Sequence, residues 1–131
     1  MIGFGKDNEE FGQVPPSLIS CEEMLGDEGF ADNALRIKIV TFTGITLQTV
    51  FPSYIMHLTR NESYTAWDEN EIREGNYLIV FKRSELMDLY NRVILHTEDY
   101  SWPGKGIHYG VYTADHVIDI IADSEPVIKK L

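Results

Sequence analysis

The segment HTEDYSWPGKGIHYG, residues 96–110, concentrates side chains that can do chemistry. It holds two of the four histidines, His96 and His108, together with Glu98, Asp99 and Trp102. A carboxylate beside an imidazole can orient the ring as a general base, and both groups can bind polar ligands or metal ions. The segment therefore indicates an active-site loop, although the same residues would also serve as an ordinary connection between a helix and a strand.

His108 gains a carboxylate neighbour if the chain after it folds as a hairpin with residues 114 and 115 at the centre of the turn. The cross-strand pairs predicted by this turn are Tyr112–Val117, Gly110–Asp119 and His108–Ile121. In this register His108 lies diagonal to Asp119, on a sheet face that also carries Tyr112. Three such residues could bind a polar ligand or act as a general base, but histidines beside carboxylates on strands are more often structural.

His96 and Asp99 can approach His108 only if the helix that precedes them ends near Leu95. The residues of this candidate ligand-binding site are His96, Asp99, Trp102, His108, Tyr112 and Asp119. The histidines show no recurrent ligand spacing, no C-x-x-C pair occurs, and neither H-E-x-x-H nor G-x-S-x-G nor a P-loop is present. We therefore expect no metal and no cofactor, and the sequence assigns no catalytic residue.

The acidic residues are distributed unevenly along the chain. The formal charge is −10, and residues 1–32 hold eight acids against one base, Lys6. A second acidic segment, residues 62–74, holds five acids and one base, Arg73. This distribution disfavours direct binding to nucleic-acid phosphates and favours a basic protein partner. The expected partner-binding residues are Trp67, Glu69, Glu71 and Glu74. The alternative is that the charge serves solubility alone.

Hydrophobic patterning predicts the elements that must position these residues. Apolar residues alternate with basic ones from Leu35 to Ile39, which indicates a half-buried strand, and residues 45–51 can return as its partner. The apolar run at 76–81 is typical of a central strand. Ser84 can cap a helix over about residues 84–95, which then leads into the strands of the predicted hairpin.

Three segments are less clear. Residues 1–33 resemble a loose acidic arm in which the capping box S-x-x-E at 20–23 predicts one short helix, ended by Gly26. Residues 52–75 show no clear pattern. A helix starting at Thr113 competes with the second hairpin strand, but the β-branched residues at 117–121 favour the strand.

These elements predict an α+β fold with a mostly antiparallel sheet of about five strands and one main helix. The length of 131 residues is that of a single domain, with the arm at 1–33 and an α+β core at 34–131. The residues expected to be mostly buried are Leu35, Ile37, Ile39, Leu78, Val80, Leu86, Leu89, Val93, Tyr109, Val111, Ile118 and Ile120.

Composition narrows the cellular setting. No run of about eighteen apolar residues is present, so we expect no membrane helix. The N-terminal residues lack the basic-then-apolar order of a secretory signal, which favours a cytoplasmic protein. Cys21 is the single cysteine and cannot form an internal disulfide, so we interpret it as a small buried apolar residue.

The absence of a catalytic signature and the local concentration of acids favour a small interaction protein without enzymatic activity. Such a protein would be an inhibitor or immunity-like module that binds a basic partner. The alternative is a small ligand-binding protein or enzyme with its pocket near His96, Trp102, His108 and Asp119. A homodimer formed through the mixed face of the hairpin is a third expectation.

Overall fold

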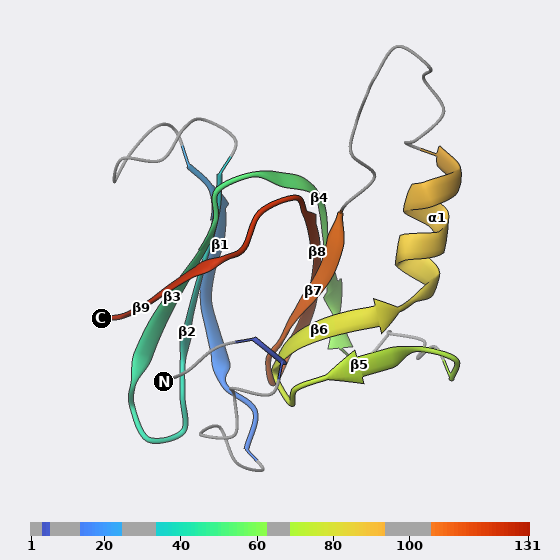
Figure 1. The fold of residues 1–131 in the computed structure, drawn as a ribbon. Coiled ribbons are helices and arrows are strands. Elements are labelled where there is room, and N and C mark those ends of the chain that lie inside the picture. The colour runs from blue at the N-terminus through green and yellow to red at the C-terminus, as the bar shows by residue number, and fades with distance from the viewer. Residues whose placement is uncertain (1–3, 6–13, 25–33, 63–68, 94–105) are drawn as a thin grey trace.

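Figure 1 shows the computed structural model, which describes residues 4–5, 14–24, 34–62, 69–93 and 106–131. Within these ranges the chain forms two antiparallel sheets, of four and five strands, and one helix. The predicted α+β class with mostly antiparallel strands is therefore confirmed, although the strands divide between two sheets. No helix in the described ranges is long and apolar enough to cross a membrane.

The four-stranded sheet has the order β1-β2-β3-β9. Its strands are β1 (Ser17–Glu23), β2 (Leu35–Val40), β3 (Thr46–Phe51) and β9 (Val127–Lys130). The predicted strand at 35–39 is confirmed, with its side chains alternately buried and half-buried. Between β2 and β3 the chain makes a wider turn than two residues, closed by the Thr41 N–H donating to the Ile45 carbonyl at 2.8 Å. Ile37 therefore lies opposite Thr49 rather than Val50.

The short helix predicted at 20–23 is wrong, because this segment lies in β1. Cys21 pairs with Ile37, so the strand covers one edge of the sheet. The capping-box pattern is a local signal worth about 1 kcal/mol, and the pairing of residues 20–23 with β2 outweighs it. Cys21 itself is only partly buried.

The five-stranded sheet has the order β4-β8-β7-β6-β5. Its strands are β4 (Tyr54–Asn61), β8 (His116–Ala122), β7 (Ile107–Tyr112), β6 (Leu78–Arg83) and β5 (Ile72–Glu74). The predicted hairpin register is confirmed, with Tyr112 opposite Val117, Gly110 opposite Asp119 and His108 opposite Ile121. The two outer strands, β4 and β5, both come from residues 52–75, the segment without a clear sequence pattern.

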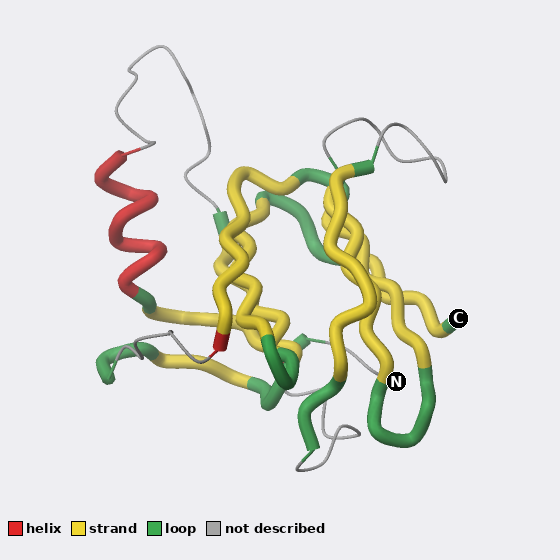
Figure 2. Tube along the Cα trace, turned by 180° about the vertical axis from the view of Figure 1, so that it is seen from behind, coloured by secondary structure: helices red, strands yellow, loops and turns green. Residues whose placement is uncertain are grey.

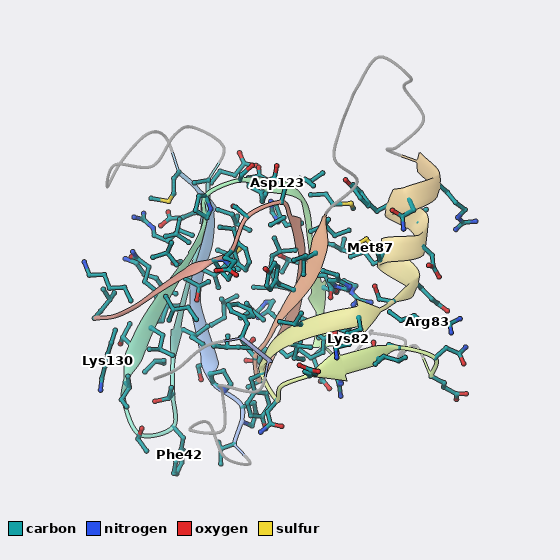
Figure 3. All side chains as sticks on the ribbon, viewed as in Figure 1. Phe42, Lys82, Arg83, Met87, Asp123 and Lys130 are labelled. Carbon is teal, nitrogen blue, oxygen red and sulfur yellow. The ribbon has the colours of Figure 1, made fainter. Side chains whose placement is uncertain are left out.

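The hydrophobic core lies between the two sheets, where the side chains fill the space in Figure 3. The four-stranded sheet contributes Leu35, Ile37, Ile39, Leu47 and Phe51, and the five-stranded sheet contributes Leu78, Tyr109, Val111, Ile118, Ile120 and Ala122. Phe42, labelled at the tip of the β2–β3 turn, points away from this core and is exposed. Alternation along each strand therefore turns every second side chain inward.

The helix α1 (Glu85–Val93) begins directly after Ser84, as predicted, and its last described residue is Val93. The view from behind in Figure 2 shows α1 on the far side of the five-stranded sheet from β1, β2 and β3. Tyr90 anchors the helix and is buried. The Tyr90 ring and Ile121 both lie next to Gly106. A Cβ added to Gly106 would lie 2.8 Å from Ile121 and 3.3 Å from the Tyr90 ring.

Several residues of the predicted core are less buried than expected. Leu89 is 44% exposed. Leu86 and Val80 are half-buried. Ile107, the first residue of β7, is 43% exposed. The side chain of Val93 lies outside the described part of the structure.

Candidate functional site

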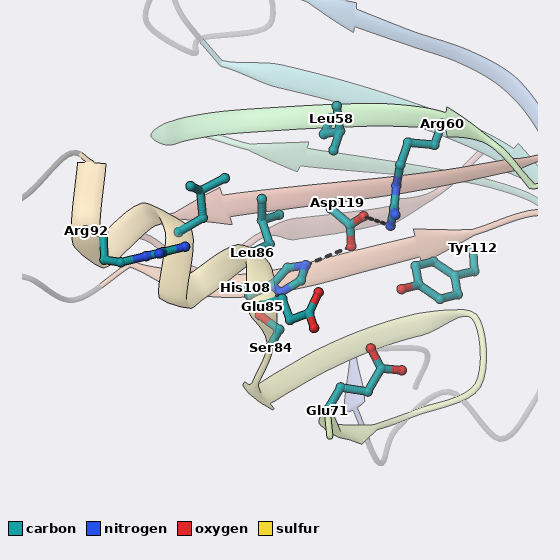
Figure 4. A pocket seen from close by; sticks show the side chains of 11 residues that line it. Leu58, Arg60, Glu71, Ser84, Glu85, Leu86, Arg92, His108, Tyr112 and Asp119 are labelled. Atoms are coloured by element: carbon teal, nitrogen blue, oxygen red, sulfur yellow. Dashed lines mark hydrogen bonds and ion pairs between the residues drawn. The ribbon is translucent and has the colours of Figure 1, made fainter. Parts of the chain in front are cut away.

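The candidate site is a pocket of about 330 Å³ between α1, β4 and the outer face of the five-stranded sheet, the face turned away from the four-stranded sheet (Figure 4). Leu58 from β4 and Leu86 and Leu89 from α1 supply its apolar lining. Its polar and charged lining comes from Arg60, Glu71, Ser84, Glu85, Arg92, His108, Tyr112 and Asp119. Pockets that bind small molecules begin at about this size and combine the same two kinds of lining.

Four polar side chains form a continuous row of hydrogen bonds, which we call the polar row: Ser84, His108, Asp119 and Arg60. Ser84 Oγ lies 2.7 Å from His108 Nδ1, and His108 Nε2 lies 2.7 Å from Asp119 Oδ1. The other carboxylate oxygen, Asp119 Oδ2, accepts a hydrogen bond from the Arg60 guanidinium at 2.6 Å. Dashed lines in Figure 4 mark the two contacts of Asp119.

Three of the four members of the polar row are buried, and the Arg60 side chain is 35% exposed. Ser84 is 4% exposed, His108 3% and Asp119 2%. A carboxylate only accepts, so His108 donates from Nε2 to Asp119. In the neutral imidazole that carries its proton on Nε2, Nδ1 accepts the proton of the Ser84 hydroxyl. Ser84 Oγ in turn accepts a hydrogen bond from the Met87 N–H at 3.1 Å. Ser84 is therefore both the N-cap of α1 and the end of the polar row.

The sheet holds the imidazole in place from its face as well as from its edges. Phe81 lies opposite His108 in the β6–β7 ladder, and the two rings stack with centroids 3.9 Å apart and planes at 13°. Gly110 leaves room for this arrangement, since an added Cβ there would lie 3.0 Å from both the Phe81 and the Tyr112 rings. The ring of His108 thus has one orientation, in which both nitrogens are engaged.

Tyr112 lines the pocket beside the polar row. Burial raises the pKa of its phenol above the ordinary value, and the nearby charges of Asp119 and Glu71 raise it further. The Arg73 guanidinium lies 5.7 Å from the centre of the ring and has an opposite, smaller effect. Tyr112 therefore presents a protonated hydroxyl, which can donate a hydrogen bond to a bound molecule.

The structure brings part of the sequence-predicted site together. His108, Tyr112 and Asp119 line one pocket, on the sheet face where the hairpin register places them. His96, Asp99 and Trp102 lie outside the described residues. Ser84 was assigned only as a helix cap, and Arg60 had no signal because the pairing of β4 with β8 was not predicted.

The predicted partner-binding residues have different environments. Glu69 is exposed. Glu71 lines the pocket and pairs with Arg73 at 3.5 Å, and Glu74 pairs with Lys82 at 2.8 Å. Trp67 lies outside the described residues. Two of the three glutamates are therefore neutralised in part by bases of the same chain.

No group of three potential metal ligands among His, Cys, Asp and Glu occurs within the described ranges. No model of a known protein family, no curated protein and no solved structure matches the chain. The geometry of the pocket is therefore the basis for inferring its function.

Proposed function

We propose that the chain binds a small amphipathic molecule, with a short apolar chain and a hydrogen-bond-accepting head group, in the pocket between α1 and the five-stranded sheet. The observation that supports this function is the polar row, which lies along a pocket that also exposes leucine side chains. One half of the ligand would cover the leucines, and the other would accept hydrogen bonds from the polar side.

The apolar lining supports the first half of this proposal. Leu58 is 42% exposed and Leu89 44%, and the half-buried Leu86 lies with them around the same pocket. Single exposed leucines are ordinary, but apolar side chains that come from two different elements to one concavity are typical of a ligand site. Covering them would remove apolar surface from water and so favour binding.

The polar lining supports the second half. The Asp119 carboxylate is buried beside Arg60, whose side chain is 35% exposed. Burying a carboxylate costs desolvation free energy, and apolar residues of similar volume are often at least as stabilising as such a pair. The polar row is therefore more naturally explained by a role in recognition or chemistry than by stability. Arg92 and the protonated Tyr112 hydroxyl add donors that suit a carboxylate or ester head group.

Fluorescence of 1-anilinonaphthalene-8-sulfonate, an apolar anion, tests the proposal, with alkyl carboxylates from butanoate to decanoate as competitors. We expect saturable binding that octanoate displaces. Leu89→Gln should weaken it about tenfold, the equivalent of about 1.4 kcal/mol of lost apolar contact. The matched control is Ile19→Gln on β1, where Ile19 is 53% exposed and lies outside the pocket lining. Unsaturable binding, or equal effects of the two substitutions, would contradict the proposal.

Binding of a basic protein is a second proposed function, favoured by one observation. β5 ends the order of the five-stranded sheet, and the exposed acids Glu62 and Glu69 lie near it in sequence. An acidic flank beside a sheet edge suits a basic segment that adds to that edge. Poly-lysine is a suitable probe: Glu69→Lys should reduce its salt-dependent binding more than Glu125→Lys, a matched change at another exposed acid. Equal reductions would instead indicate a general charge effect.

A further inference from the structure

We propose that Ser84 is a nucleophile that takes the acyl group of a small carboxylic ester bound in the pocket, with His108 as its general base. Asp119 holds the imidazole, and Arg60 holds Asp119. This inference rests on the proposed function, because the ester has to occupy the same pocket. It adds a reaction to what is otherwise a binding site.

The order and direction of the hydrogen bonds carry the inference. A serine hydroxyl is a weak nucleophile unless a base removes its proton as the bond to carbon forms. Ser84 Oγ lies 2.7 Å from His108 Nδ1. When the imidazole carries its one proton on Nε2, the Ser84 hydroxyl donates to Nδ1 along the path that the proton would take. On the far side of the ring, Asp119 accepts from Nε2 at 2.7 Å and stabilises the positive charge that the imidazole would acquire. Nucleophile, base and orienting carboxylate are thus connected in reacting order, with Nδ1 rather than Nε2 facing the serine.

The position of Ser84 at the start of α1 supplies stabilisation for the negative oxygen of the intermediate. The first N–H groups of a helix have no acceptor within the helix, and they carry the positive end of its dipole. The N–H group of Leu86, in the first turn of α1, is of this kind. Donors of this type placed beside a developing oxyanion are a large source of catalysis in acyl transfer.

The reaction needs only the ester and water. Ser84 Oγ bonds to the ester carbonyl carbon while its proton moves to His108 Nδ1. The tetrahedral intermediate collapses, the carbon–oxygen bond to the alcohol breaks, and Nδ1 returns the proton to the leaving alkoxide. Water then attacks the acyl group on Ser84 and gives a proton to Nδ1. The bond from carbon to Oγ breaks, Oγ regains the proton, and a carboxylic acid leaves.

The pocket also indicates the acyl group. Leu86 and Leu89 lie on the helix that Ser84 caps, and they line the pocket together with Leu58 of β4. Figure 4 labels Leu58 and Leu86. An acyl chain attached to Ser84 would lie among these side chains. A volume of about 330 Å³ favours short and medium chains over long ones.

A purely structural role for Ser84 is the main alternative, because its hydroxyl also caps α1. The cap accounts for the hydrogen bond from the Met87 N–H, but it does not require a buried imidazole as the acceptor of the serine proton. Ser84→Asn separates the two roles, since asparagine is among the best N-cap residues and has no hydroxyl. Thermal unfolding of this variant shows whether the helix and the fold are retained.

The experiment uses an alkyl fluorophosphonate, which transfers its phosphonyl group to an activated serine with loss of fluoride, and reads intact mass and the labelled peptide. We expect one label on Ser84 in the unaltered protein and none in Ser84→Asn. Ser17→Asn, a matched change at an exposed serine of β1, should keep the label. His108→Gln should slow labelling by about 100-fold or more, because the base is lost. Release of p-nitrophenol from p-nitrophenyl butanoate should fall in parallel.

Two results would overturn the inference: no label on Ser84 in the unaltered protein, or labelling at an unchanged rate in His108→Gln. If 1-anilinonaphthalene-8-sulfonate still binds saturably in either case, the nucleophile fails and the proposed binding function stands. If neither the fluorophosphonate nor the dye interacts with the pocket, both fail together.

Discussion

The five-stranded sheet has two buried faces, and β7 and β8 contribute neighbouring residues to both. Toward the four-stranded sheet, Tyr109, Ile118 and Ile120 form part of a continuous apolar core. Toward α1, His108 and Asp119 belong to the polar row. Ile118 is 0% exposed and Asp119 2%, so burial does not distinguish the faces. What distinguishes them is the polar row: the face toward the four-stranded sheet is held by apolar packing, whereas the face toward α1 combines a smaller apolar cluster with hydrogen bonds that must all be made together.

The largest loss of stability should follow when the polar row is broken at its centre. His108→Leu removes the donor to the buried Asp119 carboxylate, and we expect a loss of about 3–5 kcal/mol in the free energy of unfolding, measured in urea. Adding Asp119→Leu should recover part of this loss, because no buried carboxylate is then left without its donor and Arg60 can reach water. A double variant that is less stable than His108→Leu would show that the cost comes from packing.

On the apolar face, Ile118→Ala should cost about 2–5 kcal/mol through lost contacts and the cavity left behind. Ile118 lies in the core between the sheets, opposite Val111 in the β7–β8 ladder. Because its effect is on packing alone, dye binding in the pocket should persist wherever the variant is folded. A change below about 0.5 kcal/mol would mean that this face of β8 is not the core face.

A smaller effect is expected from Gly110→Ala, which acts on the polar face only. The new Cβ would lie 3.0 Å from the Phe81 and Tyr112 rings, so one of them has to shift. Overpacking of this kind costs about 1–3 kcal/mol. Because Phe81 stacks on His108, we expect weaker dye binding as well as lower stability. Unchanged binding with reduced stability would show that the pocket is insensitive to the ring stack.

The smallest effect concerns alkaline pH and involves one tyrosine from each face. Burial raises the pKa of both Tyr109 and Tyr112 above that of an exposed tyrosine. A group whose pKa is raised by folding stabilises the folded state fully below its unfolded pKa, about 10, and loses this contribution as the pH rises through the folded value. Stability should therefore decline above about pH 10, and less steeply in Tyr112→Phe or Tyr109→Phe. Thermal unfolding between pH 8 and pH 11.5, under otherwise constant conditions, measures this, and identical slopes in the variants would contradict it.

The β7–β8 hairpin could be predicted because its signals are local. Two alternating segments of similar length flank a short turn, so one choice of turn centre determines every cross-strand pair and places His108 beside Asp119. The N-cap role of Ser84 was predictable for the same reason. Of the three hydrogen bonds in the polar row, these local patterns predicted the one between His108 and Asp119.

The other two hydrogen bonds of the polar row depend on pairings between distant segments. Arg60 reaches Asp119, 59 residues away in sequence, because β4 pairs with β8, and no local pattern in residues 52–75 indicates that strand. The second hydrogen bond of Ser84 depends on the β6–β7 ladder, which places Phe81 opposite His108 and so brings the end of β6 to the imidazole. In strand β1 a local pattern gave a wrong prediction. The capping box predicts a helix, but the segment pairs with β2 as a strand.

The way α1 is attached has a consequence for the motions of the site. The nine residues of α1 that the structure describes would not be stable alone in water, so this segment depends on its Ser84 cap and on the docking of Tyr90. Its amide hydrogens should therefore exchange with solvent through local openings that leave the β7–β8 ladder closed. Each opening would withdraw Ser84 from His108, while the link from His108 to Asp119 and Arg60 stays on the sheet. The polar row thus spans a boundary between two cooperative units, and a molecule that bridges α1 and β4 would act on function by holding that boundary shut.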